Sequence, residues 1–285
     1  MTVYNHEEFV SQAIESVLGQ SFKDYELIII NDGSTDRTNK VLEKFKQNPK
    51  IVIKNIQHVG RARALNIGFN AASGEYIALL DSDDLYLPEK IGRQVEYLNL
   101  HPGVAMVGTN SIEHDLVSGR KYLNLPPTAD DDIRKLLLYD SAFPFPVVMV
   151  RAEILRQVGF CDVKLRSKID FDLFGRIASK GKLANIPETM VIVNRHPKKY
   201  FRYSLSPEHH RKARLRVRWS NLWRLKPPFI LFSRMLLWIG FEYYVNLFPE
   251  KVRNLIPNSI RATLKTTKLI HPVDTFTPLK TILDL

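Results

Sequence analysis

Short apolar runs that end abruptly in acidic residues constrain the fold of this chain more than any other feature. Residues 25–32 (YELIIIND) lead into the cluster NDGSTD, and residues 75–80 (EYIALL) lead into DSDD. Runs of this length, rich in β-branched side chains, are typical of buried strands. Amphipathic segments separate them, so the first half of the chain predicts a mostly parallel sheet covered by helices.

The same patterns predict the neighbouring elements. Further strands are expected at residues 51–56, 104–109 and 146–150. Helices are expected at residues 61–72, 88–98 and 169–181. Asn5 and Glu8 have the spacing of a capping box, so we expect another helix to begin directly after Asn5.

Charge is distributed unevenly along the chain. The formal net charge is +11, yet residues 1–194 hold 23 basic and 25 acidic side chains, whereas residues 195–285 hold 18 and 5. Such asymmetry indicates an anionic partner, either a phospholipid surface or nucleic acid. A solvated basic face with no specific partner is the alternative.

The composition changes near residue 205. We therefore predict a catalytic domain at residues 1–204 and a basic, aromatic-rich helical region at residues 205–285. Residues 227–249 are strongly apolar but include Arg234 and Glu242, which favours a helix lying in the membrane interface over one that spans the bilayer. A helix pair packed on the catalytic domain is the alternative.

Two features of the sequence indicate the cellular compartment of the protein. The chain has one cysteine, and its first residues lack the basic and apolar regions of a signal peptide. Both fit a cytoplasmic protein, with peripheral binding to the inner face of the cell membrane if the basic region contacts lipid.

Three acidic clusters are candidates for a common site. They contain Asp32, Asp81 to Asp84, and the pair Asp170 and Asp172. Ligands of open α/β sheets bind beyond the carboxyl ends of the strands. One such cluster alone is more typical of a turn than of a metal site, but three in this order favour a site. The alternate carboxylates of DSDD suit Mn²⁺ or Mg²⁺, which would neutralise a diphosphate. No Walker loop and no zinc-spaced His/Cys cluster is present.

Residues 2–36 and 60–84, which include TVYNHEEF, NDGSTD and GRARALNIGFNAASGEYIALLDSDD, resemble the inverting family 2 glycosyltransferases. The resemblance extends to about residue 196. It implies a GT-A fold, with a mixed α/β sheet flanked by helices. It also implies transfer of a sugar from a nucleotide-diphosphate donor to an acceptor hydroxyl, with inversion and with Mn²⁺ or Mg²⁺ as cofactor. UDP-sugars are the expected donors, with GDP- and dTDP-sugars as alternatives.

The resemblance also implies roles for individual residues. Thr2, Tyr4 and Glu7 (or Glu8) would line the nucleotide pocket, Asp32 would accept a hydrogen bond from the base, Arg63 would lie near the diphosphate or base, Asp81 would contact the ribose, and Asp83 would bind the metal.

Asp170 matches the aspartate of the family's later acidic motif and is the candidate general base, because the reaction needs a carboxylate within reach of the acceptor hydroxyl. The alternative for Asp170 is a carboxylate stabilised by the helix dipole, and Asp172 is expected to be structural.

The sequence departs from the family pattern at three places. Ile169 stands where a glutamate is usual, Arg195 and His196 are adjacent where the family separates them, and Met1 stands where an apolar first strand is usual. We therefore expect the first strand to be missing.

The basic tail is compatible with two functions of the chain. A membrane-associated enzyme would act on a sugar or a lipid-linked acceptor in cell-surface polysaccharide or glycolipid synthesis. A degenerate transferase-like domain would bind membrane or nucleic acid through the basic tail. The three acidic clusters argue against the degenerate domain, because a pure binding protein gains nothing from them, and nucleic acid is not the expected partner. A sugar-phosphate nucleotidyltransferase is disfavoured because residues 2–9 contain neither glycine nor lysine.

Overall fold

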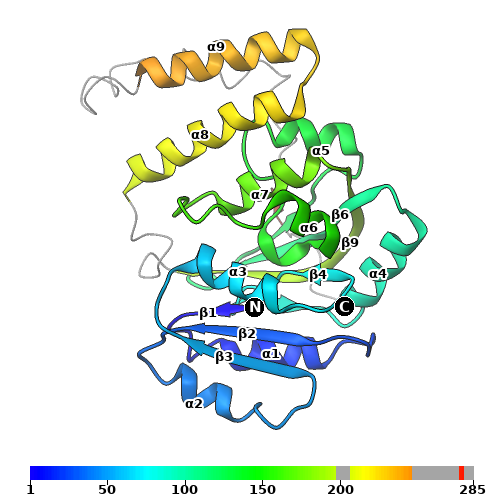
Figure 1. The fold of residues 1–285 in the computed structure, drawn as a ribbon, viewed down its shortest axis with the longest axis vertical. Helices are drawn as coiled ribbons and strands as arrows, with labels where there is room; N and C mark the ends of the chain where they lie inside the picture. The colour runs from blue at the N-terminus through cyan, green and yellow to red at the C-terminus, as the bar shows by residue number, and fades with distance from the viewer. Residues whose placement is uncertain (197–205, 246–275, 279–285) are drawn as a thin grey trace.

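The computed structural model describes residues 1–196, 206–245 and 276–278, which form a mixed α/β fold (Figure 1). Its first sheet is parallel and has the order β1 (Thr2–Val3), β2 (Leu27–Asp32), β3 (Ile51–Ile56). All six residues of β2 are buried. The continuous apolar run therefore forms a strand covered on both faces, as the sequence predicted.

The second sheet is mixed and lies beside the first. Its main path is β10 (Phe276–Pro278), β7 (Lys121–Asn124), β6 (Val104–Asp115), β8 (Met149–Arg151) and β4 (Tyr76–Ala78). β9 (Lys182–Arg195) pairs in parallel with β6 and antiparallel with β5 (Leu85–Tyr86). A bridge between Thr2 and Asp81 joins the sheets, so the carboxyl end of β4 lies next to β1.

The N-terminal residues, where the sequence predicted the loss of a strand, form the two-residue strand β1. The Met1 amino group donates to the Ile28 carbonyl at 2.8 Å, and the Met1 carbonyl accepts the Ile30 N–H at 3.0 Å. The segment thus lies between β2 and the DSDD loop, and it carries the following residues to the edge where the acidic clusters meet.

Helices cover both sheets. α3 (Arg61–Ala71) lies on one face of the first sheet, and α1 (Val10–Leu18) and α2 (Thr38–Glu43) lie on the other (Figure 1). The second sheet is flanked by α4 (Lys90–Leu100), α5 (Asp130–Leu136), the short 3₁₀ helix η1 (Phe145–Val147), α6 (Ala152–Val158) and α7 (Ile169–Ala178). One large cluster of buried apolar side chains joins these layers.

The predicted capping box at Asn5 is wrong. α1 begins at Val10, and Asn5 instead has a left-handed backbone with φ of 53°. Its side-chain oxygen accepts the N–H groups of Thr35 at 2.7 Å and Asp36 at 3.4 Å. Asparagine tolerates this conformation better than most residues because its side chain can bond to nearby backbone. Asn5 therefore ties the segment after β1 to the NDGSTD loop rather than starting a helix.

β9 is an element that the sequence analysis did not predict. Its 14 residues pair with β6 from Val104 to Asp115, with shifts of register near Thr109 to Ser111. The strand ends at Arg195 and so brings Asn194 and His196 to the DSDD loop, while Arg195 pairs with Glu113 of β6 at 2.6 Å.

The predicted boundary between residues 204 and 205 lies outside the described residues. Beyond it, α8 (Pro207–Leu225) packs on α7, and α9 (Phe229–Val245) turns back over α8 (Figure 1). A Cβ at Gly175 of α7 would come within 2.1 Å of the Asn221 Oδ1 atom, so the glycine permits this close approach. α8 and α9 are thus packed on the catalytic domain, and contact of this helix pair with a membrane interface stays a prediction. Among the described residues, no helix combines the length and apolarity needed to cross a bilayer.

Candidate active site

The DSDD loop forms an acidic cluster at the carboxyl end of β4. Carboxylate oxygens of Asp81, Asp83 and Asp84 lie within 4.8 Å of one another. Asn194, at the end of β9, holds the loop in place. Its backbone N–H donates to Asp84 Oδ1 at 2.8 Å, and its side-chain amide donates to the Asp83 carbonyl at 2.6 Å. Hard oxygen ligands at this separation fit Mg²⁺ or Mn²⁺.

Crowding of these carboxylates shows in the pKa of Asp84. Burial, together with the charges of Asp83 and Asp81, raises the pKa of Asp84 well above its usual range. Burial also pushes the pKa of Asp83 upward, but the hydrogen bond from His196 and the charge of His6 outweigh it, so the pKa of Asp83 lies below its usual value. A bound cation would relieve the same repulsion.

Two histidines contact the loop. His196 Nε2 lies 2.9 Å from Asp83 Oδ2, and His6 Nδ1 lies 2.8 Å from the Ser82 hydroxyl. The sequence left the place of His196 open and did not single out His6. Only the pairing of distant segments brings both rings to this loop, so a local pattern could not have found them.

Arg61, the first residue of α3, lies against the acidic cluster. Its Nη2 atom is 2.5 Å from Asp81 Oδ1, and its guanidinium lies over the Phe145 ring at 5.1 Å. Burial lowers the pKa of Arg61, but the charges of Asp81 and Asp170 outweigh that effect and the pKa lies above its usual value. The arginine therefore stands in the electrostatic field of both the DSDD loop and α7.

The sequence analysis selected Arg63, whereas the structure brings Arg61 to the cluster. Arg63 is exposed, and its Nη1 atom lies 3.5 Å from the Val59 carbonyl. Two residues along a helix are about 200° apart around its axis, so only one of the two can face the cluster. The role of Arg63 near the diphosphate or base stays a prediction.

Asp170 is half-buried in the first turn of α7. Burial raises its pKa, and the positive charges of Lys168 and Arg61 only partly oppose that rise. A carboxylate with a raised pKa is better matched to accepting a proton near neutral pH. The charge of Asp170 thus acts on Arg61, the same arginine that pairs with Asp81 of the DSDD loop.

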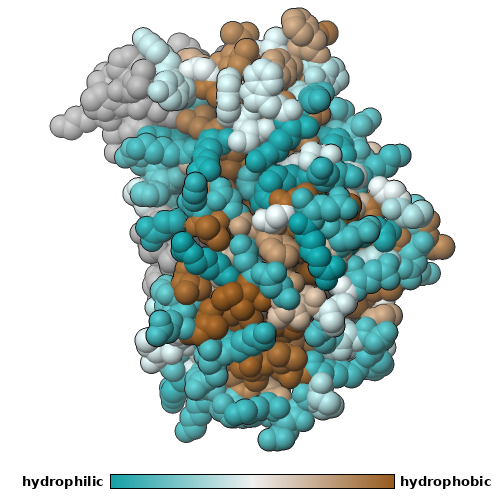
Figure 2. All heavy atoms as spheres, viewed as in Figure 1, coloured by the Kyte–Doolittle hydropathy of each residue, from teal (hydrophilic) through white to brown (hydrophobic). Residues whose placement is uncertain are grey.

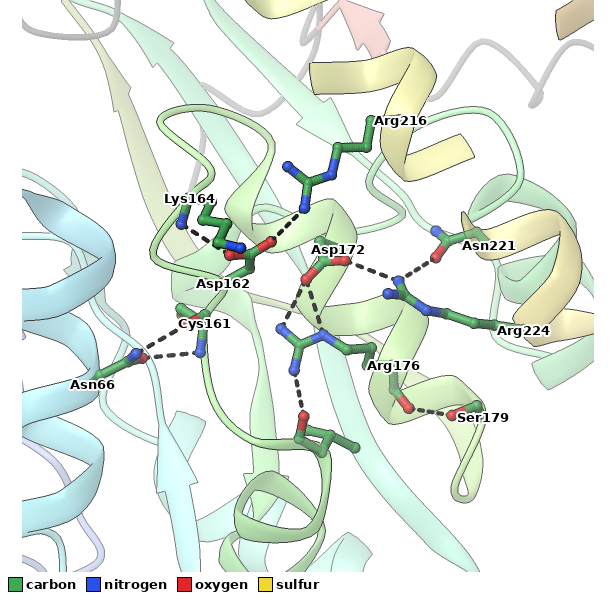
Figure 3. A network of polar contacts seen from close by, with 11 residues as sticks. Asn66, Cys161, Asp162, Lys164, Asp172, Arg176, Ser179, Arg216, Asn221 and Arg224 are labelled. Atoms are coloured by element: carbon green, nitrogen blue, oxygen red, sulfur yellow. Dashed lines mark hydrogen bonds and ion pairs between the residues drawn. The ribbon is translucent and has the colours of Figure 1, made fainter. Parts of the chain in front are cut away.

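Asp172, two residues further on, has a structural environment. It is buried and accepts hydrogen bonds from Arg176 Nε and Arg224 Nη1, both at 2.9 Å (Figure 3). These contacts join α7 to α8, as expected for a structural carboxylate.

Asp32 organises the loop before α3. Its two carboxylate oxygens accept the N–H groups of Val59 at 2.7 Å and Gly60 at 3.0 Å. His58 Nδ1 lies 3.1 Å from Asp32 Oδ2, and Tyr4 stacks on the His58 ring with 4.2 Å between centroids. His58 therefore contacts both of the predicted pocket residues, Tyr4 and Asp32.

Thr2 and Glu7 occupy opposite ends of the predicted pocket segment. Thr2 bridges to Asp81. The Glu7 carboxylate accepts the Arg37 backbone N–H at 2.6 Å and its Nε–H at 3.2 Å. Glu7 is thus engaged with the turn before α2, while Thr2 adjoins the acidic loop.

A family model described as glycosyl transferase family 2 matches residues 1–159, more than half of the chain. The chain belongs to glycosyl transferase family 2. The matched region contains β1, the NDGSTD loop, Arg61 and the DSDD loop, so this part of the site lies within the family's own segment.

Several curated relatives of this family 2 chain are glycosyltransferases by name. "Putative glycosyltransferase EpsE" of Bacillus subtilis (strain 168) is 32% identical over 186 residues, covering 64% of this chain and 66% of the relative. Amylovoran biosynthesis glycosyltransferase AmsE of Erwinia amylovora is 28% identical over 198 residues, covering 68% and 74%. The match thus spans just under two thirds of EpsE.

Solved structures share the GT-A fold with this chain. Staphylococcus aureus TarS 1–349 in complex with UDP-GlcNAc has a TM-score of 0.68 at 15% identity, covering 92% of this chain and 76% of TarS. The mannosyltransferase PcManGT from Pyrobaculum calidifontis, in complex with GDP-Man and Mn²⁺, has a TM-score of 0.53 at 15% identity, covering 93% and 82%. The predicted fold class is confirmed.

Proposed function

We propose that this family 2 protein transfers a sugar from a nucleotide-diphosphate donor to an acceptor hydroxyl, with inversion and with a divalent cation. The observation that carries the proposal is the grouping of Asp81, Asp83 and Asp170 around Arg61. Structural neighbours add support, since TarS was solved with UDP-GlcNAc and PcManGT with GDP-Man and Mn²⁺.

The base of the donor is proposed to bind beside Tyr4, His58 and Asp32. An aromatic pair next to a buried carboxylate offers both a stacking surface and a hydrogen-bond acceptor. Asp32 Oδ1 accepts the Val59 N–H and, as a carboxylate oxygen, can accept a second hydrogen bond, whereas Oδ2 accepts the Gly60 N–H and also lies 3.1 Å from His58 Nδ1. Thr2, Glu7 and Asp81 are proposed to complete the pocket, with Asp81 at the ribose, and a UDP-sugar is the proposed donor.

The residues of the DSDD loop fit a resident Mn²⁺ or Mg²⁺, because three carboxylates converge and the charges of Asp83 and Asp81 add to the rise in the pKa of Asp84. Asp83 is proposed as the direct ligand. The ion would neutralise the diphosphate and stabilise the charge that develops as it leaves. Arg61 would add a fixed positive charge at the same place.

Asp170 is proposed as the general base. Its carboxylate would accept the proton of the acceptor hydroxyl while the oxygen attacks the anomeric carbon. Attack from the face opposite the diphosphate inverts the anomeric centre. The proposed acceptor is a sugar or lipid-linked hydroxyl used in cell-surface polysaccharide or glycolipid synthesis, reached from the cytoplasm. AmsE, whose name assigns it to amylovoran biosynthesis, supports a role of this kind.

Donor turnover tests the proposal without knowledge of the acceptor. The full chain is incubated with UDP-glucose, UDP-N-acetylglucosamine or GDP-mannose, with Mn²⁺ or with a chelator, and the sugar released to water is followed by NMR. We expect one donor to be consumed only with the metal and to give first the anomer opposite to the donor's. Release of the same anomer would contradict inversion, and metal-independent turnover would contradict the cation. No turnover of any donor by a folded chain would favour the degenerate domain.

A further inference from the structure

The side of α8 that faces away from α7 carries basic and aromatic side chains. The exposed residues Lys212, Arg216, Trp219 and Trp223, and Lys226 directly after the helix, follow one another at spacings of four and three, with Lys212 paired to Glu208 at 2.8 Å and Arg216 to Asp162 at 3.1 Å. This spacing places them along one side of the helix. The opposite side, with Val217, Arg218, Asn221 and Leu222, is buried against the rest of the protein.

α9 continues this division. Its inward residues Met235 and Ile239 are buried with Leu222 of α8. Its outward residues are large and apolar, and Phe229, Ile230 and Leu237 are 83%, 67% and 76% exposed. Figure 2 shows apolar side chains along the end of the molecule where α9 lies. An apolar row of this kind on one face is uncommon unless something covers it.

The acidic residue of α9 is turned away from this face. Glu242 pairs with Arg218, which also donates to the Tyr139 carbonyl at 2.6 Å and lies over the Trp238 ring at 4.1 Å. Arg234, by contrast, is exposed. Residues 207–245 hold eight basic and two acidic side chains, the other acid being Glu208 at the start of α8. The outward side is therefore apolar and positively charged.

The two outward faces adjoin one another. Trp223 of α8 packs edge-on against Phe232 of α9 at 5.2 Å between centroids, and Trp219 lies 5.9 Å from Trp223. We call the exposed residues of α8 and α9 together the α8–α9 surface. It combines aliphatic residues, tryptophans and tyrosines with flanking lysines and arginines.

We propose that the α8–α9 surface docks on an anionic lipid bilayer. α9 has 17 residues and so is about 25 Å long, enough to lie along the interface as an apolar ridge. Tryptophan and tyrosine prefer the level of the headgroups, and the lysines and arginines attract anionic lipids. The surface lies outside the candidate active site, so the inference goes beyond the proposed function and does not rest on it.

Two other occupants fit the surface less well. Nucleic acid would use the basic and aromatic residues of α8, but not the aliphatic side chains of Ile230 and Leu237. A second copy of the chain related by a twofold axis would bring like patches together, so that the positive charges would repel. A lipid surface uses both the apolar and the basic residues.

The docking would also orient the active site. Arg224 of α8 is bonded to Asp172 of α7, the helix whose first turn contains Asp170. A bilayer bound to the outward side of α8 would therefore hold α7 at a fixed distance from the lipid.

Vesicle flotation of the full chain tests the proposal. Vesicles of phosphatidylcholine alone are compared with vesicles that also contain phosphatidylglycerol, at low and high salt. We expect binding to the anionic vesicles that weakens with salt, because screening shortens the reach of the surface potential. Replacing Ile230→Glu together with Leu237→Glu, or Lys212→Glu together with Lys226→Glu, should lower the partition coefficient at least about tenfold.

A matched control separates the surface from general effects of added charge. Leu100→Glu with Val117→Glu changes two side chains that are each 70% exposed and lie outside α8 and α9, and should leave vesicle binding unchanged. Thermal unfolding of every variant checks that each is folded. Absence of wild-type binding, equal binding to both vesicles, or an equal loss in the control would overturn the proposal. So would a dimer that the Ile230→Glu and Leu237→Glu changes dissociate, or RNA binding that these changes leave intact.

Discussion

Two carboxylates on α7, only two residues apart, have different surroundings. Asp172 is buried and bonded to two arginines, Arg176 and Arg224, which join α7 to α8. Asp170 is half-buried with a raised pKa, and it shares the field of Arg61 with the DSDD loop. The first region is electrostatically compensated within the protein. The second holds a surplus of carboxylates, which is costly for folding and useful for binding cations and accepting protons.

The largest effect is expected when the carboxylate of Asp170 is replaced by an amide. Asp170→Asn removes the proposed proton acceptor, so kcat should fall by about 10²- to 10⁴-fold while the donor Kd stays unchanged. The exposed Asp131→Asn, on α5, is the matched control and should keep full activity. Steady-state rates and calorimetry with the same donor measure the two quantities. Equal kcat in Asp170→Asn and wild type would remove Asp170 from the mechanism.

Separate substitutions of the two arginines of α3 test which of them acts with the DSDD loop. Arg61→Ala removes a charge-assisted contact with the cluster, so donor affinity should weaken by about 10- to 100-fold. Arg63→Ala should change it much less, because Arg63 is exposed and Arg61 contacts Asp81. The donor Kd of each variant, measured at saturating Mn²⁺, decides between them. A larger loss in Arg63→Ala would favour the assignment made from sequence.

Removing the carboxylate of Asp172 should affect the stability of the protein rather than its catalytic rate. Asp172→Asn leaves Arg176 and Arg224 without their shared carboxylate and should lower the free energy of unfolding by about 3 kcal/mol. Below its unfolding temperature the variant should keep most of its kcat. Urea unfolding at neutral pH measures the change. A stable but inactive Asp172→Asn would instead indicate that Asp172, and not Asp170, is the general base.

The smallest expected effect is on pH dependence. A general base works when it is deprotonated, so activity should fall as pH falls through the raised pKa of Asp170. Lys168 lowers that pKa. Lys168→Met should therefore raise it and move the acidic limb of the rate profile to higher pH. A limb that stays in place, or moves to lower pH, would show that another group sets it.

Much of the fold could be predicted because its signals are local. β3 spans residues 51–56 as expected, and α3 spans Arg61–Ala71 against a predicted 61–72. β9 was not predicted because its partner residues in β6 are 77 to 80 positions away and its own pattern is irregular near Pro187. Asn5 was assigned to a helix cap because its actual partners, Thr35 and Asp36, lie on a different segment.

The candidate site, like the fold, could be predicted only where its signals are local. The sequence singled out Asp81, Asp83 and Asp170, since each follows or begins a recognisable element, and their roles stay predictions. It selected Arg63 and not Arg61, because the direction of one helix face cannot be derived from the sequence. His6 and His196 reach the DSDD loop from segments 190 residues apart in the chain, so no spacing could indicate that they meet.

The most direct test of the central claim is calorimetric titration of UDP into the full chain, with and without Mn²⁺, for wild type and Asp83→Ala. We predict that UDP binds the wild type only with Mn²⁺ and that Asp83→Ala loses this dependence together with most of the affinity. UDP binding that is equally tight in Asp83→Ala, or that needs no metal, would contradict the assignment of the DSDD loop as the cation site of a nucleotide-sugar transferase.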